Sequence, residues 1–122
     1  MILADTSVWV DHLRAGNERL QAALEQGQIV THAFVVAELA LGLLPDRFQI
    51  LALLDRLPHL RTAQMSELRL MIEARRLYSL GIGLVDTHLL ASVFTSPPTL
   101  LWTKHTRLHK VAEALGVNAK FL

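Results

Sequence analysis

Short apolar runs alternate with amphipathic stretches along the whole chain, and this alternation constrains the fold more than any other feature. Strands that alternate with helices are typical of an α/β domain with a mostly parallel sheet. The apolar runs predict strands at 2–4, 28–31, 59–63 and 100–103, and an edge strand at 119–122. The amphipathic stretches predict helices at 7–13, 18–26, 33–44, 46–57, 66–79, 85–95 and 106–115. The expected architecture is a three-layer α/β/α sandwich.

Length and composition narrow the class of protein. A chain of 122 residues without an obvious linker or repeat favours one domain spanning residues 1–122. Because 52% of the residues are hydrophobic and 19% are charged, a disordered chain is excluded. The absence of cysteine excludes a disulfide scaffold, a thiolate metal site and a thiol nucleophile. The mean hydropathy of +0.34 is high for a soluble monomer and indicates that a partner covers some apolar surface.

The longest apolar stretch, at 33–44, is apolar nearly all round and predicts a buried helix. It contains Glu38 and is shorter than the roughly 20 residues that a membrane-spanning helix needs. The first residues lack both a basic segment and a long apolar segment, so no signal peptide is predicted. We therefore expect a cytoplasmic protein without a membrane segment.

Three acidic residues lie in sequence that otherwise favours burial. Asp5 is the only charged residue among the first ten, and Glu38 is the only one at 33–45. Asp86 is the only one between residues 76 and 104. Asp5 and Asp86 are each placed to cap a helix, whereas Glu38 falls within one. Because a buried carboxylate without a cation is costly, a shared site is the alternative explanation.

The predicted sheet brings these acids together, because the carboxyl ends of adjacent parallel strands border one crevice. At about 4 Å separation each pair of carboxylates would repel by about 4 kcal/mol at an effective dielectric constant of about 20. Protonation or a divalent cation must relieve that repulsion. Oxygen ligands favour Mg²⁺ or Mn²⁺ over zinc. Such ions bind phosphate and activate water for attack on phosphorus.

Four short blocks carry a resemblance to a known family. They read ADTSVWVD at 4–11, VAEL at 36–39, VDTHLLA at 85–91 and LWT at 101–103. In this order and at this length they resemble PIN-domain ribonucleases, specifically the VapC type of toxin from bacterial toxin–antitoxin pairs. The resemblance implies a PIN-like fold and a metal-dependent endoribonuclease that hydrolyses RNA phosphodiester bonds. It also implies neutralisation by a cognate antitoxin and a homodimer.

The resemblance assigns the acids roles at the site. Asp5 and Asp86 would bind Mg²⁺, with Mn²⁺ as the other candidate. Glu38 would complete the catalytic acidic pocket or hold the metal-bound water, and Thr6 and Thr103 would help to orient that water.

One position departs from the family pattern. The family usually has an Asp two residues after the Thr of the last block, and this chain has His105. Three interpretations stay open. The metal remains on Asp5 and Asp86, His105 is itself a ligand and suits Mn²⁺ better, or the protein is a catalytically weakened PIN-fold binding protein for RNA or antitoxin. We favour the first, because Mg²⁺ sites often use one or two carboxylates plus waters.

Basic residues near the last helix are candidates for binding RNA. Lys104, Arg107 and Lys110 are spaced by three, which places them on a similar side of a helix and suits a phosphate backbone. A solvated basic face explains the same spacing equally well.

The remaining apolar features predict packing. Trp9 and Trp102 lie in apolar runs and are expected in the core or an interface rather than stacked on bases. The apolar faces of the helices at 18–26 and 46–57 are expected in the core, with an antitoxin groove as the alternative.

Overall fold

The computed structural model describes residues 1–121 and contains one parallel sheet. Its strands are β1 (Ile2–Ala4), β2 (Ile29–Val30) and β3 (Leu100–Trp102), in the order β2-β1-β3. Leu3 lies opposite Val30 on one side and Leu101 on the other. Because all three strands run in the same direction, their carboxyl ends meet at one edge of the sheet.

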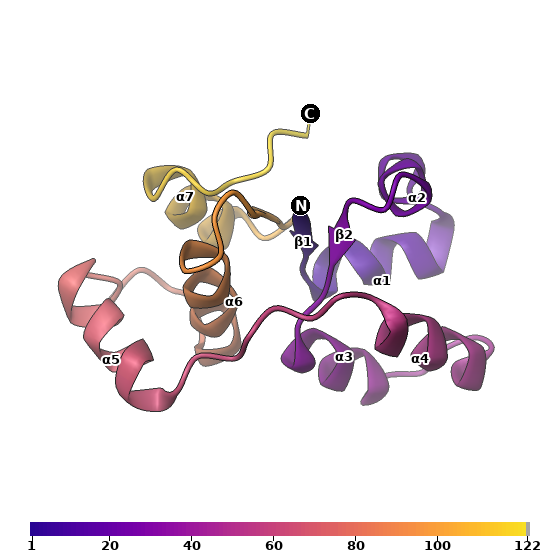
Figure 1. Cartoon of the computed structure of the whole chain (residues 1–122), viewed down its shortest axis with the longest axis horizontal. Coiled ribbons are helices and arrows are strands. Elements are labelled where there is room, and N and C mark those ends of the chain that lie inside the picture. The colour runs from indigo at the N-terminus through magenta and orange to yellow at the C-terminus, as the bar shows by residue number, and fades with distance from the viewer. Residues whose placement is uncertain (122) are drawn as a thin grey trace.

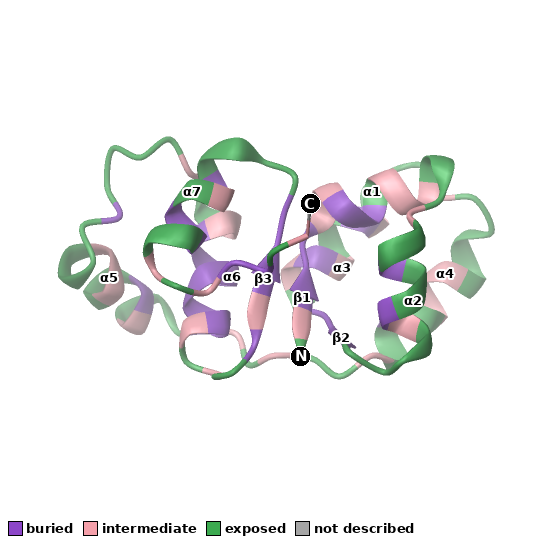
Figure 2. Cartoon of the chain, turned by 90° about the horizontal axis from the view of Figure 1, so that it is seen from above, coloured by how far each residue is buried: buried purple, intermediate pink, exposed green. Residues whose placement is uncertain are grey.

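The helices lie in two groups on either side of the strands (Figures 1 and 2). One group comprises α1 (Thr6–Ala15), α2 (Glu18–Glu25), α3 (Ala33–Ala40) and α4 (Arg47–Arg56). The other comprises α5 (Met65–Ala74), α6 (Leu84–Phe94) and α7 (Thr106–Ala114). The predicted three-layer α/β/α architecture with a parallel sheet is therefore confirmed.

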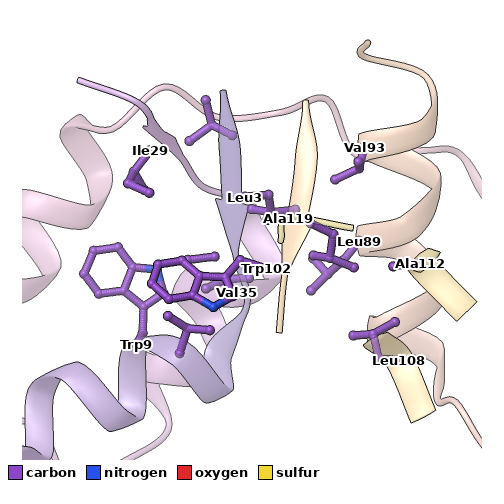
Figure 3. Packing of buried hydrophobic residues seen from close by; sticks show 14 of the residues in the cluster. Leu3, Trp9, Ile29, Val35, Leu89, Val93, Trp102, Leu108, Ala112 and Ala119 are labelled. Atoms are coloured by element: carbon purple, nitrogen blue, oxygen red, sulfur yellow. The ribbon is translucent and has the colours of Figure 1, made fainter. Parts of the chain in front are cut away.

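One hydrophobic core joins both groups of helices to the sheet (Figure 3). Trp9 of α1 and Trp102 of β3 are only 1% and 7% exposed, so the prediction that both tryptophans pack inside the protein is confirmed. Leu89 of α6 and Leu108 of α7 extend the same cluster. Burying each such side chain contributes about 1.5–3 kcal/mol, so this core is the main attachment of the helices to the strands.

The strand predicted at 59–63 is not formed. His59 makes a single isolated parallel bridge with Thr31, and the N–H of Leu60 donates to the carbonyl of Thr31 over 2.9 Å. Pairing stops there because β2 ends at Val30 and the chain turns into α3 at its N-cap, His32. An apolar run next to a two-residue strand therefore has no further partner along which to extend.

The edge strand predicted at 119–122 is also absent from residues 119–121, and residue 122 lies outside the described part of the chain. Asn118 makes one isolated parallel bridge with Leu101. The N–H of Ala119 donates to the carbonyl of Leu101 over 2.8 Å, and no second bridge follows among the described residues.

The helix predicted at 33–44 ends at Ala40, and its surroundings differ from the expected all-round burial. Leu41 and Leu43 beyond its end are 88% and 102% exposed. The guanidinium of Arg47 donates to the carbonyl of Ala40 over 2.6 Å and to that of Gly42 over 3.3 Å. These bonds satisfy carbonyls at the helix end and stabilise the turn into α4.

The helix predicted at 66–79 also stops early, at Ala74. Arg76 and Ser79 have φ values of 54° and 61°, which a continuing α-helix does not allow. The loop that follows leads to the start of α6.

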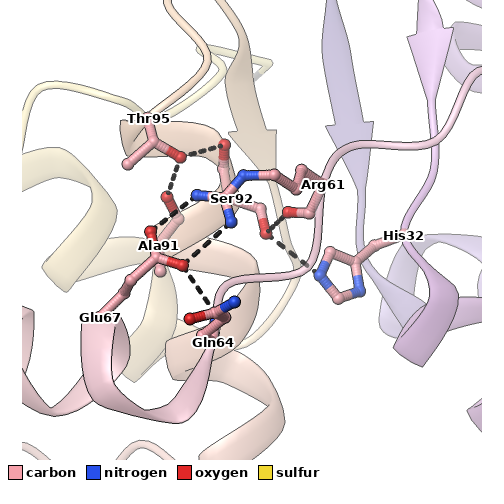
Figure 4. Close-up of polar contacts among 7 residues, drawn as sticks. All are labelled: His32, Arg61, Gln64, Glu67, Ala91, Ser92 and Thr95. Atoms are coloured by element: carbon pink, nitrogen blue, oxygen red, sulfur yellow. Dashed lines mark hydrogen bonds and ion pairs between the residues drawn. The ribbon is translucent and has the colours of Figure 1, made fainter.

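Hydrogen bonds fasten the segment before α5 to α6 (Figure 4). The Oγ of Ser92 lies 3.1 Å from Nε2 of His32 and donates to the carbonyl of Arg61 over 2.7 Å. The Arg61 guanidinium donates to both carboxylate oxygens of Glu67, over 2.9 and 2.7 Å. This ion pair, with the N–H of Gln64, lowers the pKa of Glu67 to about 2.

No helix within residues 1–121 combines the length and the apolar character that crossing a lipid bilayer demands.

Candidate active site

A cavity of about 460 Å³ opens at the carboxyl ends of β1 and β3. Asp5, Glu38 and Asp86, which come from three separate regions of the sequence, all line it. Asp11 adds a fourth carboxylate that the sequence analysis did not select. The lining also includes two cations, Arg14 and Lys104, so the four acids leave a surplus of negative charge that favours a cationic ligand.

Asp5 directly follows β1, is 2% exposed and caps α1. Its Oδ1 accepts the hydroxyl of Ser7 over 2.5 Å and the N–H of Val8 over 3.2 Å. Its Oδ2 accepts the hydroxyl of Thr103. Three donors thus fix the carboxylate in one orientation. Each carboxylate oxygen has about two acceptor positions, so capacity for a ligand remains.

The loop after β3 is attached to Asp5 through two hydroxyl groups. The N–H of Lys104 donates to Oγ of Ser7 over 2.9 Å, and the N–H of His105 donates to Oγ1 of Thr103 over 3.0 Å. Ser7 and Thr103 each accept from this loop and donate to Asp5. From the sequence alone, Ser7 is expected only as part of the first block or as a cap of the helix that follows, and the structure gives the cap to Asp5. Its role depends on a contact with residue 104 that no local pattern shows.

Glu38 lies on α3 and is exposed, so the expectation that all three acids are buried is wrong. Only Asp5 is buried, and Asp86 is intermediate. The hydroxyl of Thr6 donates to Oε1 of Glu38 over 2.6 Å, which joins α1 to α3 at the cavity. Thr6 therefore orients a carboxylate directly.

Asp86 is the third residue of α6 and combines the two roles that its position suggested. The N–H of Gly83 donates to its Oδ2 over 3.4 Å, which is a long capping contact. The same side chain lines the cavity. The carboxylate therefore both marks the start of α6 and lines the same pocket as Asp5 and Glu38.

Asp11 lies one helical turn beyond Ser7 on α1 and forms an ion pair across the cavity mouth. The Nζ of Lys104 lies 3.0 Å from its Oδ1, and Nδ2 of Asn17 donates to its Oδ2 over 3.1 Å. Both contacts lower the pKa of Asp11. The nearby Arg14 made Asp11 look like an ordinary surface acid, although its four-residue spacing from Ser7 places both on one face of the helix.

The three basic candidates lie in different places. Lys104 precedes α7 and lines the carboxylate cavity. Arg107 borders an adjoining hollow of about 300 Å³ together with Asp86 and His105. Lys110 borders a third cavity farther along α7, which Arg107 borders as well. His105 is exposed and lines both of the first two. The three cations therefore do not gather in the carboxylate cavity, which only Lys104 of the three lines.

The carboxylates suit a hard cation in their chemistry but do not form a complete cage. All four side chains offer oxygen donors, which Mg²⁺ and Mn²⁺ prefer. Within residues 1–121, no three acidic or histidine side chains converge closely enough to enclose an ion. Mg²⁺ often binds one or two carboxylates and keeps several waters. The chemistry of these donors therefore suits an ion that takes one or two carboxylates and completes its shell with water.

Comparison with known proteins agrees with this arrangement. Residues 2–114 match the PIN domain family. The chain is also similar to two proteins called "Ribonuclease VapC32", from the CDC 1551 / Oshkosh and ATCC 25618 / H37Rv strains of Mycobacterium tuberculosis. Each is 39% identical over 117 residues, which cover 96% of this chain and 94% of the relative. The four sequence blocks, the parallel sheet and the match over nearly the whole chain agree, and the protein belongs to the PIN-domain family.

Proposed function

We propose that this protein is a metal-dependent endoribonuclease toxin of the VapC type, which hydrolyses RNA phosphodiester bonds and is neutralised by a cognate antitoxin. The observation that carries the proposal is that Asp5, Glu38 and Asp86 line one cavity beside the ammonium of Lys104. Acids that attract a divalent cation, next to a cation that attracts phosphate, suit phosphodiester hydrolysis. The similarity to proteins named ribonucleases supports the same activity.

Asp5 and Asp86 would hold Mg²⁺, or Mn²⁺ in its place. When bound, the ion neutralises the carboxylates, polarises the phosphate and increases the acidity of water. Asp5 suits this role because Ser7 and Thr103 keep its carboxylate in place before a ligand arrives.

Glu38 is the candidate proton acceptor. Its Oε1 accepts the Thr6 hydroxyl over 2.6 Å, which leaves Oε2 to accept the proton of the attacking water. Its exposure suits this role, because a base that receives a proton from solvent water must be reached by water. The Thr6 hydroxyl keeps the carboxylate turned toward α1.

Lys104 would bind a non-bridging oxygen of the scissile phosphate. Its backbone is fixed to Ser7 and its Nζ to Asp11, so the ammonium is held at the cavity mouth. A fixed cation stabilises the charge that develops on phosphate oxygens without reorganising during the reaction.

A catalytically weakened RNA- or antitoxin-binding protein is the alternative that His105 raised. The similarity to ribonucleases over 96% of the chain does not favour it. We assign His105 to the edge of the pocket, where its imidazole borders the hollow next to Asp86.

Partners and location follow from the proposed activity. Leu41 and Leu43 after α3, and Phe48 in the first turn of α4, are 86–102% exposed and provide the kind of apolar surface that the mean hydropathy predicted. We propose that the antitoxin covers this surface, that the toxin is a homodimer, and that both act in the cytoplasm, where cellular RNA is found. Light scattering of the purified chain with and without the antitoxin tests both associations.

Cleavage of a labelled RNA by the purified, antitoxin-free chain tests the activity. We expect cleavage with Mg²⁺ or Mn²⁺, none with EDTA, and a loss of at least about 100-fold in Asp5→Asn. Asp55→Asn removes an exposed acid from α4 and is the matched control, with unchanged activity. Cleavage that persists in EDTA or in Asp5→Asn would contradict the mechanism.

A further inference from the structure

The cavity that Lys110 borders has a volume of about 300 Å³ and lies between α7 and the segment that follows α5. Arg75, Arg107 and Lys110 border it, and its lining contains no carboxylate among the described residues. Leu80 and Val111 contribute to an apolar floor. The cavity therefore combines a surplus of positive charge with a surface on which a flat, weakly polar group can pack.

Within residues 1–121 these three cations form no ion pair with an acidic side chain. The ion pairs of residues 1–121 involve Arg14, Arg61 and Lys104, and none involves Arg75, Arg107 or Lys110. The Arg75 guanidinium lies 4.6 Å from the centroid of the Phe94 ring, a cation–π contact that holds it in place without neutralising it. An anion bound here would relieve the mutual repulsion of the three charges.

Arg107 connects this cavity to the candidate active site. It borders both the basic cavity and the hollow that contains Asp86 and His105. A Cβ atom at Gly81 would lie 2.7 Å from Nη1 of Arg107 and 2.8 Å from its Cδ, so the arginine packs where any larger residue would stand. Gly81 has a φ of +77°, which also favours glycine. Gly81 thereby leaves room for the Arg107 side chain against the turn that leads into the helix carrying Asp86.

We infer that this basic cavity binds one nucleotide of the RNA strand, adjacent to the phosphate that is cleaved. Arg75 and Lys110 would bind phosphate oxygens and Arg107 would guide the strand from the carboxylate pocket. A nucleobase would pack on Leu80 and Val111. The inference rests on the proposed nuclease function, because the continuity with Asp86 through Arg107 is what favours RNA over an acidic protein segment as the occupant.

Binding of a fluorescently labelled 12-nucleotide oligouridylate to the full-length chain in EDTA tests the inference. The double variant Arg75→Gln/Lys110→Gln is compared with Arg56→Gln/Arg69→Gln, which removes the same charge from exposed sites on α4 and α5. Each lost phosphate contact on single-stranded nucleic acid lowers the slope of log K against log salt by about 0.7. We expect the slope to fall by about 1.4 in the first variant and by much less in the control.

A second variant and a kinetic measurement distinguish lost RNA binding from a general effect of the substitutions on folding. Leu80→Glu places a carboxylate in the cavity without removing a cation, and it should also weaken oligouridylate binding. In cleavage assays the first variant should raise KM about tenfold, with a smaller effect on kcat.

The outcomes separate this inference from the nuclease proposal. If the wild-type chain cleaves RNA but the double variant keeps its salt slope and KM, the subsite is wrong and the nuclease stands. If no RNA is cleaved under any condition, the nuclease proposal fails, and the oligouridylate arm still decides on the subsite. Binding of labelled decaglutamate to the same variants is measured alongside. If the double variant loses affinity for decaglutamate but not for oligouridylate, the cavity binds an acidic protein segment, which overturns the inference.

Discussion

The hydroxyl of Thr103 donates a hydrogen bond to Oδ2 of Asp5, although the two residues lie 98 positions apart in the sequence. The same Thr103 oxygen accepts the N–H of His105. The pairing of β1 with β3 makes this contact possible, since Ala4 and Trp102 are register partners immediately before the two residues. The acidic pocket is therefore a direct product of the parallel sheet.

Thr103→Val should damage both the pocket and the fold, because valine keeps the shape but loses the hydroxyl. A hydrogen bond to a charged group contributes about 1.5–3 kcal/mol, so we expect the free energy of unfolding to fall by about 2 kcal/mol. We also expect kcat to fall at least about tenfold, because Asp5 loses one of its three donors. Urea denaturation and RNA cleavage measure the two effects. Thr103→Ser restores the hydroxyl and should recover most of both, and a fully active Thr103→Val would contradict this role.

Asp11→Asn should separate substrate binding from catalysis. The variant removes the carboxylate that holds Lys104 and raises the positive charge at the cavity mouth. We expect KM to fall about threefold because RNA is attracted more strongly, and kcat to fall about tenfold because the ammonium is no longer positioned. Steady-state cleavage kinetics measure both constants, with Asp55→Asn as the control. A rise in KM with unchanged kcat would mean that Asp11 does not position Lys104.

The local sequence predicted the parts of this protein that depend on local rules. The runs at Ile2–Ala4 and Leu100–Trp102 are strands, and Asp5, Glu38 and Asp86 do line one cavity. The apolar run after His59 failed as a strand because its partner β2 is only two residues long. The length of the partner strand depends on tertiary structure, so an apolar run alone does not predict whether it will pair.

Asp11 and Ser7 were not predicted as site residues for the same physical reason. Asp11 has a cation three residues away in sequence, yet its closer partner is Lys104, 3.0 Å across the cavity. Ser7 likewise obtains its role from the loop after β3. Glu38 was expected to be buried because its neighbours in sequence are apolar, whereas it lies on the solvent side of α3 and faces an open pocket. Contacts across a sheet edge are set by topology and not by neighbours in the chain.

The stability of the protein should depend on pH through His32. This residue is fully buried, and burial, together with the nearby His88 and His59, lowers its pKa to about 4. Its Nδ1 accepts the N–H of Phe34, so Nε2 carries the proton and donates to Ser92. The folded protein therefore favours neutral His32, while the unfolded chain binds a proton near pH 6.5.

The lower pKa of His32 in the folded protein sets the direction in which stability changes with pH. Stability from His32 is complete above about pH 6.5 and is lost as the pH falls toward 4, by about 3 kcal/mol in total. Urea denaturation at several pH values measures the loss. His32→Asn keeps a side-chain acceptor for the N–H of Phe34 and should remove this part of the pH dependence. A wild-type stability that stays constant from pH 7 to pH 4.5 would show that His32 is not held neutral.

His105→Asp tests whether the pocket needs a further carboxylate for catalysis. The variant adds a carboxylate at the edge of the cavity that already contains Asp5 and Asp86. If two carboxylates suffice to hold Mg²⁺, the new acid should raise the apparent affinity for the ion and change kcat at saturating Mg²⁺ by no more than about threefold. Cleavage rates measured over a range of Mg²⁺ concentrations separate the two quantities, and His105→Asn controls for loss of the imidazole. A gain of about 100-fold in kcat would show instead that the natural protein is catalytically weakened, because the missing charge would then limit the reaction even when the ion is bound.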